Sequence, residues 1–69
     1  MADPAMQAEL VALVRRNRRP LTIGEIAMQW GVSRPTAAKY VDICEAAGLL
    51  RSTWFATARQ VTAKGGRIR

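Results

Sequence analysis

The apolar positions of the chain follow three helical patterns in turn and then change to an alternating one. The first pattern places on one helix face Met6, Leu10, Leu13 and Val14. The second pattern uses Ile23, Ile26, Ala27 and Trp30, and the third uses Ala37, Tyr40, Val41 and Cys44. After Gly48 the residues favour strands. The chain is therefore predicted to form three helices followed by a β-hairpin.

The first helix has recognisable start and stop signals. Asp3 can cap the helix N-terminus, and Pro4 suits the first helical position because its missing N–H has no helical partner there. The helix is expected to end in the segment RRNRRP, residues 15–20, where cations favour the C-terminal dipole and proline stops the helix. Four arginines within five positions exceed what the dipole alone requires.

The second helix is specified at both ends. Thr22 and Glu25 have the spacing of a capping box, in which each side chain bonds the backbone N–H of the other residue. Leu21 and Ile26 flank this cap as a hydrophobic staple. Gly31 can adopt the left-handed conformation that helix C-termini commonly need. A helix from Ile23 to Trp30 follows from these signals.

The third helix begins so soon after the second that the two must cross steeply. Ser33 is its expected cap and Pro35 lies in its first turn, so the helix spans residues 33–47, with Gly48 after its C-terminus. Ala27 allows the two helices to approach closely, and Val32 fills the space below the turn. This is the geometry of a helix-turn-helix.

Two runs of strand-forming residues follow, and they are expected to pair as a hairpin over residues 49–62 that turns near residues 55–58. Neighbouring strand residues point to opposite faces, so Trp54 and Phe55 cannot both be buried by one straight strand. Trp54 is expected in the core, and Phe55 is expected to be exposed. Cys44 is expected to be a small core residue rather than a reactive thiol.

The pattern of Ala27, Gly31 and Val32 resembles the helix-turn-helix signature of bacterial and phage DNA-binding regulators. Three helices followed by Gly48-Leu49-Leu50 and a hairpin resemble the winged helix-turn-helix family. The segment VTAKGGR, residues 61–67, is similar to a strand-end sequence motif of small bacterial regulators in that family. The resemblance implies a mainly α fold with a small β-hairpin, the wing, in one domain over residues 1–64. Residues 65–69 are expected to be a short, basic, flexible tail.

Composition narrows the function. The chain has 69 residues and a formal net charge of +6, which favours polyanionic partners. It has no His and one Cys, so the sequence offers neither a zinc site nor a histidine for general base catalysis, and its five carboxylates are scattered. No enzyme activity, metal or cofactor is expected. No apolar run is long enough to span a membrane, and no secretory signal is visible. The expected location is the cytoplasm.

The resemblance and the charge together predict a sequence-specific double-stranded DNA-binding protein, a small transcriptional regulator. By the resemblance, helix 33–47 enters the major groove and hairpin 49–62 lies on the backbone beside it. The residues expected to read bases are Arg34, Thr36 and Lys39. The residues expected to contact phosphate are Ser33, Arg15, Arg16, Arg18, Arg19, Arg51 and Arg59. Basic segments would thus lie on both sides of the same helix.

Two other functions remain open from the sequence. One is a DNA-architectural role like that of phage excisionases, and the other is a winged-helix module that binds protein and no DNA. A homodimer or a partner protein is expected, because one domain covers little DNA. Val11 and Phe55 are the candidate contacts with that partner. No small-molecule ligand is expected.

Overall fold

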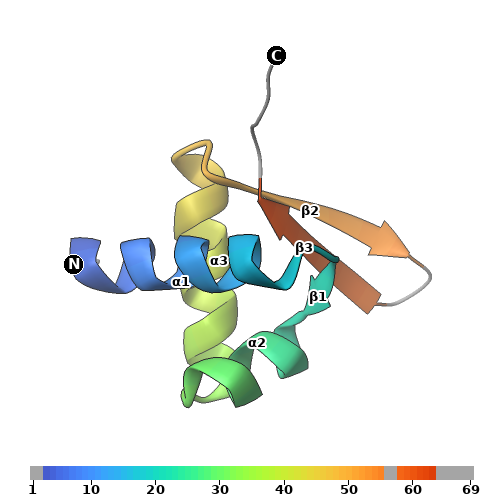
Figure 1. The fold of residues 1–69 in the computed structure, drawn as a ribbon, viewed down its shortest axis with the longest axis horizontal. Helices are drawn as coiled ribbons and strands as arrows, with labels where there is room; N and C mark the ends of the chain where they lie inside the picture. The colour runs from blue at the N-terminus through green and yellow to red at the C-terminus, as the bar shows by residue number, and fades with distance from the viewer. Residues whose placement is uncertain (1–2, 56–57, 64–69) are drawn as a thin grey trace.

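The computed structural model describes residues 3–55 and 58–63, and the side chain of Phe55 and the tail 65–69 lie outside this description. The described residues form three helices and three strands, and Figure 1 shows how they are arranged. In chain order they are α1 (Pro4–Asn17), β1 (Leu21–Thr22), α2 (Ile23–Trp30), α3 (Arg34–Ala46), β2 (Leu50–Phe55) and β3 (Ala58–Ala63). The predicted fold class, three helices with a small hairpin as in a winged helix-turn-helix, is confirmed.

The helix ends form as the sequence predicts. The Asp3 carboxylate accepts a hydrogen bond of 2.9 Å from the Ala5 N–H at the start of α1. Both bonds of the capping box are present, because Thr22 N–H donates to Glu25 at 2.9 Å and Glu25 N–H donates to Thr22 Oγ1 at 3.1 Å. Gly31, with φ 79°, takes the left-handed conformation after α2. The helix-turn-helix is thus fixed by local bonds.

The sheet contains one strand that the sequence did not reveal. Its order is β1-β3-β2, and both pairings are antiparallel. The two-residue strand β1 pairs with β3 through Leu21 opposite Val61 and Thr22 opposite Gln60. The hairpin strands pair from Leu50 opposite Ala63 to Phe55 opposite Ala58. The wing is therefore attached by its inner strand to the segment that begins α2.

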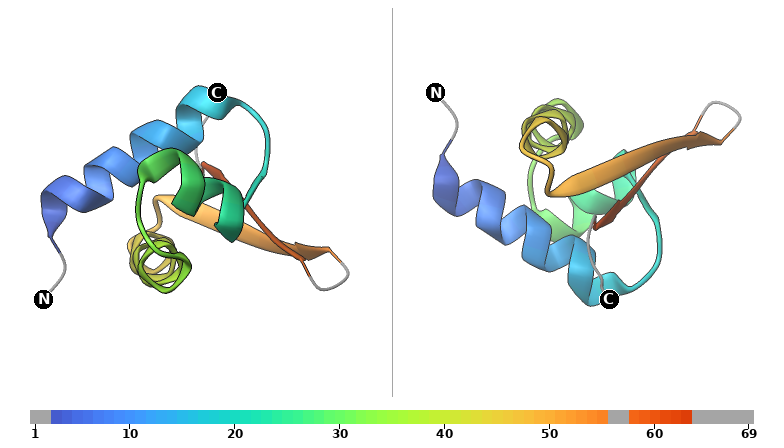
Figure 2. Two further views of the ribbon diagram at one scale, coloured as in Figure 1. Left: turned by 90° about the horizontal axis from the view of Figure 1, so that it is seen from below. Right: turned by 90° about the horizontal axis from the view of Figure 1, so that it is seen from above.

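The core lies between the helices and the inner face of the sheet. It consists of residues that are at most 9 % exposed: Leu10, Leu13, Val14, Leu21, Ile26, Ala27, Ala37, Tyr40, Val41, Cys44, Leu50 and Val61. The predicted inner face of the third helix is confirmed, and Cys44 is buried as expected. Figures 1 and 2 show α1 crossing α3, with the hairpin projecting beyond the helices.

The expectation that Trp54 lies in the core is wrong, because its side chain is 65 % exposed. The register places Ser52 opposite the buried Val61 and Trp54 opposite Arg59. By strand alternation, Trp54 is on the same face of β2 as the buried Leu50. The hairpin extends past the helices, however, so the outer part of this face has no core above it (Figure 2).

Candidate nucleic-acid interface

The exposed side of α3 carries different charges in its two halves. Residues spaced three or four positions apart share one helix face, and the solvent-facing row of α3 consists of Pro35, Lys39, Asp42 and Ala46, all exposed. The cations Arg34 and Lys39 lie in the N-terminal half of the helix, whereas Asp42 and Glu45 lie in the C-terminal half. Only the N-terminal half is therefore suited to a polyanion.

Arg34 lies against the first turn of α2. A Cβ atom built on Gly24 would be 3.3 Å from Nη2 and 3.4 Å from Nε of the Arg34 side chain. Because Gly24 has no side chain, the Arg34 guanidinium can lie beside α2, and Arg34 as a whole remains exposed. Arg34 is held near the junction of both helices of the helix-turn-helix.

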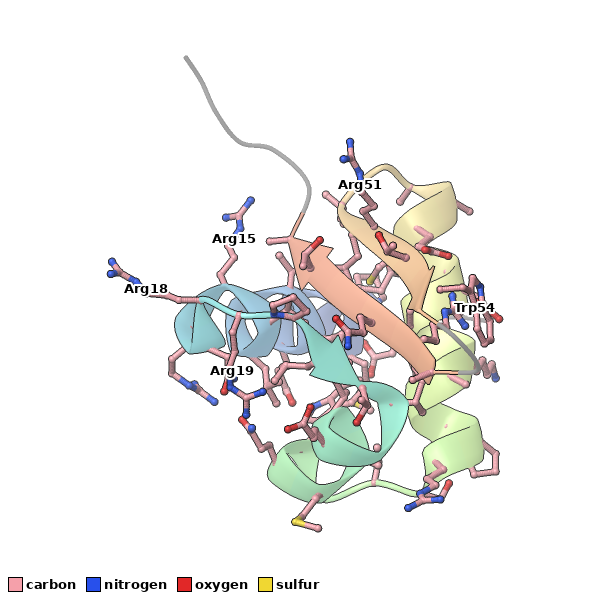
Figure 3. All side chains as sticks on the ribbon, turned by 90° about the vertical axis from the view of Figure 1, so that its right-hand side faces the viewer. Arg15, Arg18, Arg19, Arg51 and Trp54 are labelled. Atoms are coloured by element: carbon pink, nitrogen blue, oxygen red, sulfur yellow. The ribbon has the colours of Figure 1, made fainter. Side chains whose placement is uncertain are left out.

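A hollow of about 500 Å³ separates α3 from the wing. It is lined by Thr22, Ile23, Gly24, Arg34, Ala38, Trp54, Ala58 and Arg59. The indole of Trp54 is exposed on the α3 side of the hairpin, as Figure 3 shows. The hollow thus combines apolar side chains with Arg34, which forms no ion pair within residues 3–55 and 58–63.

The hydroxyl groups at the start of α3 bond to each other. Ser33 Oγ accepts a hydrogen bond of 3.3 Å from the Thr36 N–H and donates one of 2.9 Å to Thr36 Oγ1. Ser33 is exposed and Thr36 is half-buried, so both can still meet a ligand. The Lys39 ammonium lies 6.0 Å from the centre of the Tyr40 ring, at the outer limit of a cation–π contact.

Arg59 does not project toward solvent. Its guanidinium Nη2 lies 2.6 Å from Asp42 Oδ1 and 2.8 Å from Glu45 Oε1, and its Nε donates to Ser52 Oγ at 2.8 Å. The Arg59 side chain is 14 % exposed. Its charge is therefore used to hold the wing against α3, and this geometry does not support the expected phosphate contact.

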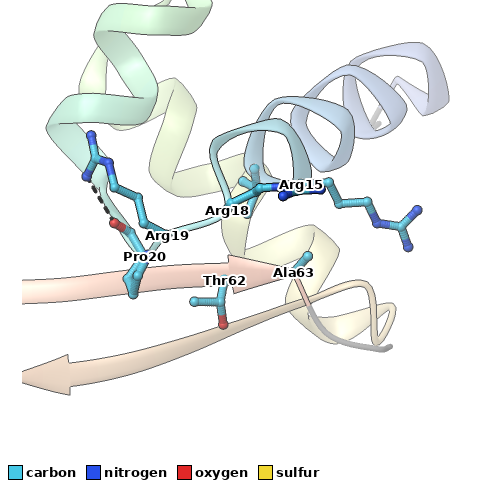
Figure 4. Close-up of a pocket in the computed structure, with 7 residues that line it drawn as sticks. Arg15, Arg18, Arg19, Pro20, Thr62 and Ala63 are labelled. Atoms are coloured by element: carbon cyan, nitrogen blue, oxygen red, sulfur yellow. Dashed lines mark hydrogen bonds between the residues drawn. The ribbon is translucent and has the colours of Figure 1, made fainter. Parts of the chain in front are cut away.

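The structure does not bring the arginines at the C-terminal end of α1 together with α3. Figure 3 shows Arg15, Arg18 and Arg19 at the edge of the molecule opposite α3 and Trp54. Arg19 Nη2 bonds Glu25 Oε2 at 3.1 Å, and Arg19 Nη1 bonds the Pro20 carbonyl at 3.4 Å (Figure 4). The backbone hydrogen bond from Thr22, and then the Arg19 side chain, lower the pKa of Glu25.

Arg51 is also separated from the α3 side of the wing. It lies opposite Thr62 in the sheet, and by strand alternation its side chain is on the other face of β2 from Trp54. The expected positive charge on both sides of α3 is thus not present, since the cations occupy different faces.

The comparisons with known proteins identify the family. Residues 4–66 match the MarR family over nearly the whole chain. The chain belongs to the MarR family. Its members are winged-helix transcriptional regulators, which is the class of DNA-binding protein that the sequence predicts.

A solved structure supports the fold of this MarR-family chain. The crystal structure of the transcriptional regulator SlyA superposes with a TM-score of 0.75 at 23 % sequence identity. The match covers 83 % of this chain but 42 % of the SlyA chain, so this chain spans less than half of that regulator. No curated protein matches the chain.

The described part of the MarR-family domain, residues 3–55 and 58–63, holds no cluster of three or more side chains suited to a metal ion. None of the helices described is long and apolar enough to cross a membrane. The sequence did not reveal two features of the interface. One is the place of Trp54 in the hollow, and the other is the contact of Gly24 with Arg34. Gly24 lies in the first turn of α2, where no turn requires a glycine, and this was the sequence signal for its contact with Arg34.

Proposed function

We propose that this MarR-family domain regulates transcription by binding double-stranded DNA with the N-terminal half of α3 in the major groove. The observation that carries the proposal is the position of Arg34. This first residue of α3 places its guanidinium beside Gly24 of α2, and it lines the same hollow as the exposed Trp54. The hairpin β2–β3 is then the wing, and one DNA strand follows the hollow between wing and helix.

Each residue of this half of α3 has a proposed role. Arg34 reads a guanine or holds the adjacent phosphate through its parallel N–H donors, and Lys39 contacts a guanine or a phosphate one turn further. Pro35 and Ala38 are small, so they let the helix backbone approach the base edges. Ser33 contributes a phosphate contact and Thr36 a base contact, within the limits of their mutual bond.

The carboxylates of α3 set the limit of the interface. Asp42 is 65 % exposed, and Arg59 shares its single positive charge between Asp42 and Glu45. The two carboxylates therefore keep a net negative charge that repels phosphate. The DNA is therefore expected to leave the helix before Asp42. This arrangement favours a short reading surface, so specificity requires a second copy or a partner on adjacent DNA.

Two copies of the chain on one operator form the simplest such assembly, and dimers are common among MarR-type regulators. Small-molecule ligands are also common in that family, so the absence of a ligand here stays a prediction. The proposed function places the protein in the cytoplasm with the DNA it regulates. It requires no enzyme activity.

The experiment begins with selection of bound duplexes from random sequence. The affinity of the selected duplex is then measured against salt concentration for the wild type and for the double variant Arg34→Ala/Lys39→Ala. The double variant is expected to lose the sequence preference, and its log–log salt slope should become shallower by about 2, as for two lost phosphate contacts.

A charge-matched control is Arg16→Ala/Arg18→Ala, which also removes two positive charges. It should keep the sequence preference and the affinity for a single duplex. If both double variants weaken binding equally and leave the preference intact, α3 does not read the DNA. If the wild type binds no duplex at low salt, the domain is a protein-interaction module.

A further inference from the structure

A second cationic surface lies on the side of the domain away from α3. We call it the α1 basic surface and define it as Arg15, Arg16 and Arg18. All three residues are exposed, and none of them forms an ion pair within residues 3–55 and 58–63. Arg18 ends α1 in the left-handed conformation, with φ 61°. The helix dipole accounts for one or two cations at this end but not for all of them.

Two hollows border these arginines. One, of about 310 Å³, lies between the end of α1 and β3 and is lined by Val14, Arg15, Arg18, Arg19, Pro20, Thr62 and Ala63 (Figure 4). The other, of about 730 Å³, is lined by Ala8, Val11, Ala12, Arg15, Arg16, Arg18 and Leu49. Arg15 and Arg18 line both hollows, so a sugar–phosphate backbone that crossed this surface would meet cations beside each hollow.

A duplex held by α3 does not reach this surface. Arg15 and Arg18 are at the edge opposite α3 and Trp54 (Figure 3), across a body whose smallest Cα extent is 20 Å. DNA has a persistence length of about 150 base pairs, so folding one duplex tightly around so small a body is costly. Any partner of the α1 basic surface is therefore a different molecule from the duplex on α3.

The chemistry of the surface favours nucleic acid over an acidic protein. Its charge is unpaired and its apolar part is slight, since Leu49 is 37 % exposed, Val11 is half-buried and the other apolar residues of the larger hollow are alanines. Protein interfaces depend on a few large anchors, often aromatic, whereas phosphate binding needs mainly accessible cations.

We propose that the α1 basic surface binds a second DNA duplex, so that one domain bridges two duplexes. The proposal rests on the proposed function, because the first duplex occupies α3. The contact is to phosphate alone, so the second duplex is bound without sequence preference and more weakly at high salt.

The test uses the 69-residue chain, a selected duplex fixed to beads and a labelled duplex of unrelated sequence in solution. The wild type should retain the labelled duplex on the beads at low salt. The variant Arg15→Gln/Arg16→Gln/Arg18→Gln should reduce this retention by about tenfold or more, as for three lost phosphate contacts, and keep its affinity for the fixed duplex. Light scattering checks that the variant has the same oligomeric state.

The outcomes separate this inference from the function on which it depends. If the protein binds the fixed duplex but retains no labelled duplex, the bridging proposal fails and the proposed function stands. If it binds no duplex, both fail. If the triple variant bridges as well as the wild type, the bridges arise from α3 surfaces of associated copies, and the proposal is overturned.

A last measurement addresses an acidic protein partner. In the variant Arg34→Ala/Lys39→Ala, the remaining duplex binding should depend on the α1 basic surface and disappear when the three glutamine substitutions are added. If that double variant binds polyglutamate through Arg15, Arg16 and Arg18 but binds no duplex, the partner is an acidic protein and the proposal is overturned.

Discussion

Arg59 on β3 and Asp42 on α3 are joined by a contact of 2.6 Å between Nη2 and Oδ1. The same guanidinium nitrogen lies 2.8 Å from Glu45. Because Arg59 belongs to β3 and both carboxylates to α3, the contact fixes the angle between the two elements that would embrace DNA. It also removes one arginine from the cations available to a ligand and balances one of the two negative charges of Asp42 and Glu45.

Replacing Arg59 with Gln should therefore weaken DNA binding without changing its salt dependence. The wing loses its ion pairs with α3 and keeps its pairing with β1. No phosphate contact is lost, so the log–log slope stays within about 0.3 of the wild type, whereas a lost phosphate contact would change it by about 0.9. The free energy of unfolding should fall by about 1 to 2 kcal/mol, since a charged, hydrogen-bonded group is removed. A slope reduced like that of Arg34→Ala would instead identify Arg59 as a phosphate contact.

Gly24→Ala should separate stability from DNA binding. Alanine is favoured over glycine inside a helix, so the free energy of unfolding should rise by up to about 1 kcal/mol. The new Cβ would lie 3.3 Å from the Arg34 guanidinium, which must move, so DNA affinity should fall by a small factor and fall further in Gly24→Leu. Chemical denaturation and DNA titration measure the two effects, and undiminished affinity in both variants would show that the position of Arg34 has no importance.

The capping box should make stability depend on pH in the acid range. The bond from Thr22 and the Arg19 side chain hold the folded pKa of Glu25 below its usual value of about 4.3. The stabilising effect of the ionised carboxylate is complete above that value and is lost as the pH falls below it toward the folded pKa. Melting temperatures should thus differ between the wild type and Glu25→Gln at pH 6, and the difference should shrink as the pH falls below about 4.3. A difference that is constant over this range would rule out the linkage.

Cys44 should be unreactive in the folded protein. Burial raises the pKa of its thiol, and its side chain is not exposed. Alkylation by iodoacetamide at pH 8 should therefore be slow in buffer and fast in denaturant. The thiol of the unfolded chain ionises above about pH 8.5, and the folded thiol ionises only at higher pH. The free energy of unfolding should therefore fall as the pH rises past about 8.5, because ionisation then favours the unfolded chain. Rapid alkylation of the native protein would show that Cys44 reaches solvent.

The parts of the structure that depend on neighbouring residues were predictable from the sequence. The Thr22–Glu25 box, the turn at Gly31 and the buried face of α3 each need only a few adjacent positions, and all of them form as expected. The winged helix-turn-helix fold followed from these features together with the hairpin, whereas the MarR family was identified by the family match.

The features that sequence reasoning missed depend on how distant elements meet. The exposure of Trp54 depends on how far the hairpin extends beyond the helices, which strand alternation does not determine. Arg59 meets carboxylates that lie 14 and 17 positions away in the chain. The separation of Arg15 and Arg18 from α3 arises from the crossing of α1 over α3, which no local pattern records.

Thr22 gives the domain an unusual mechanical coupling. This residue is the cap of α2 and also the partner of Gln60 in the β1–β3 pairing. Opening of the wing at its inner strand therefore releases the first turn of α2, and unravelling of that turn frees the strand edge. Amide hydrogen exchange at Glu25 and Val61 should accordingly proceed at similar rates by a shared opening event, so that the first turn of α2 and the inner strand of the wing open together.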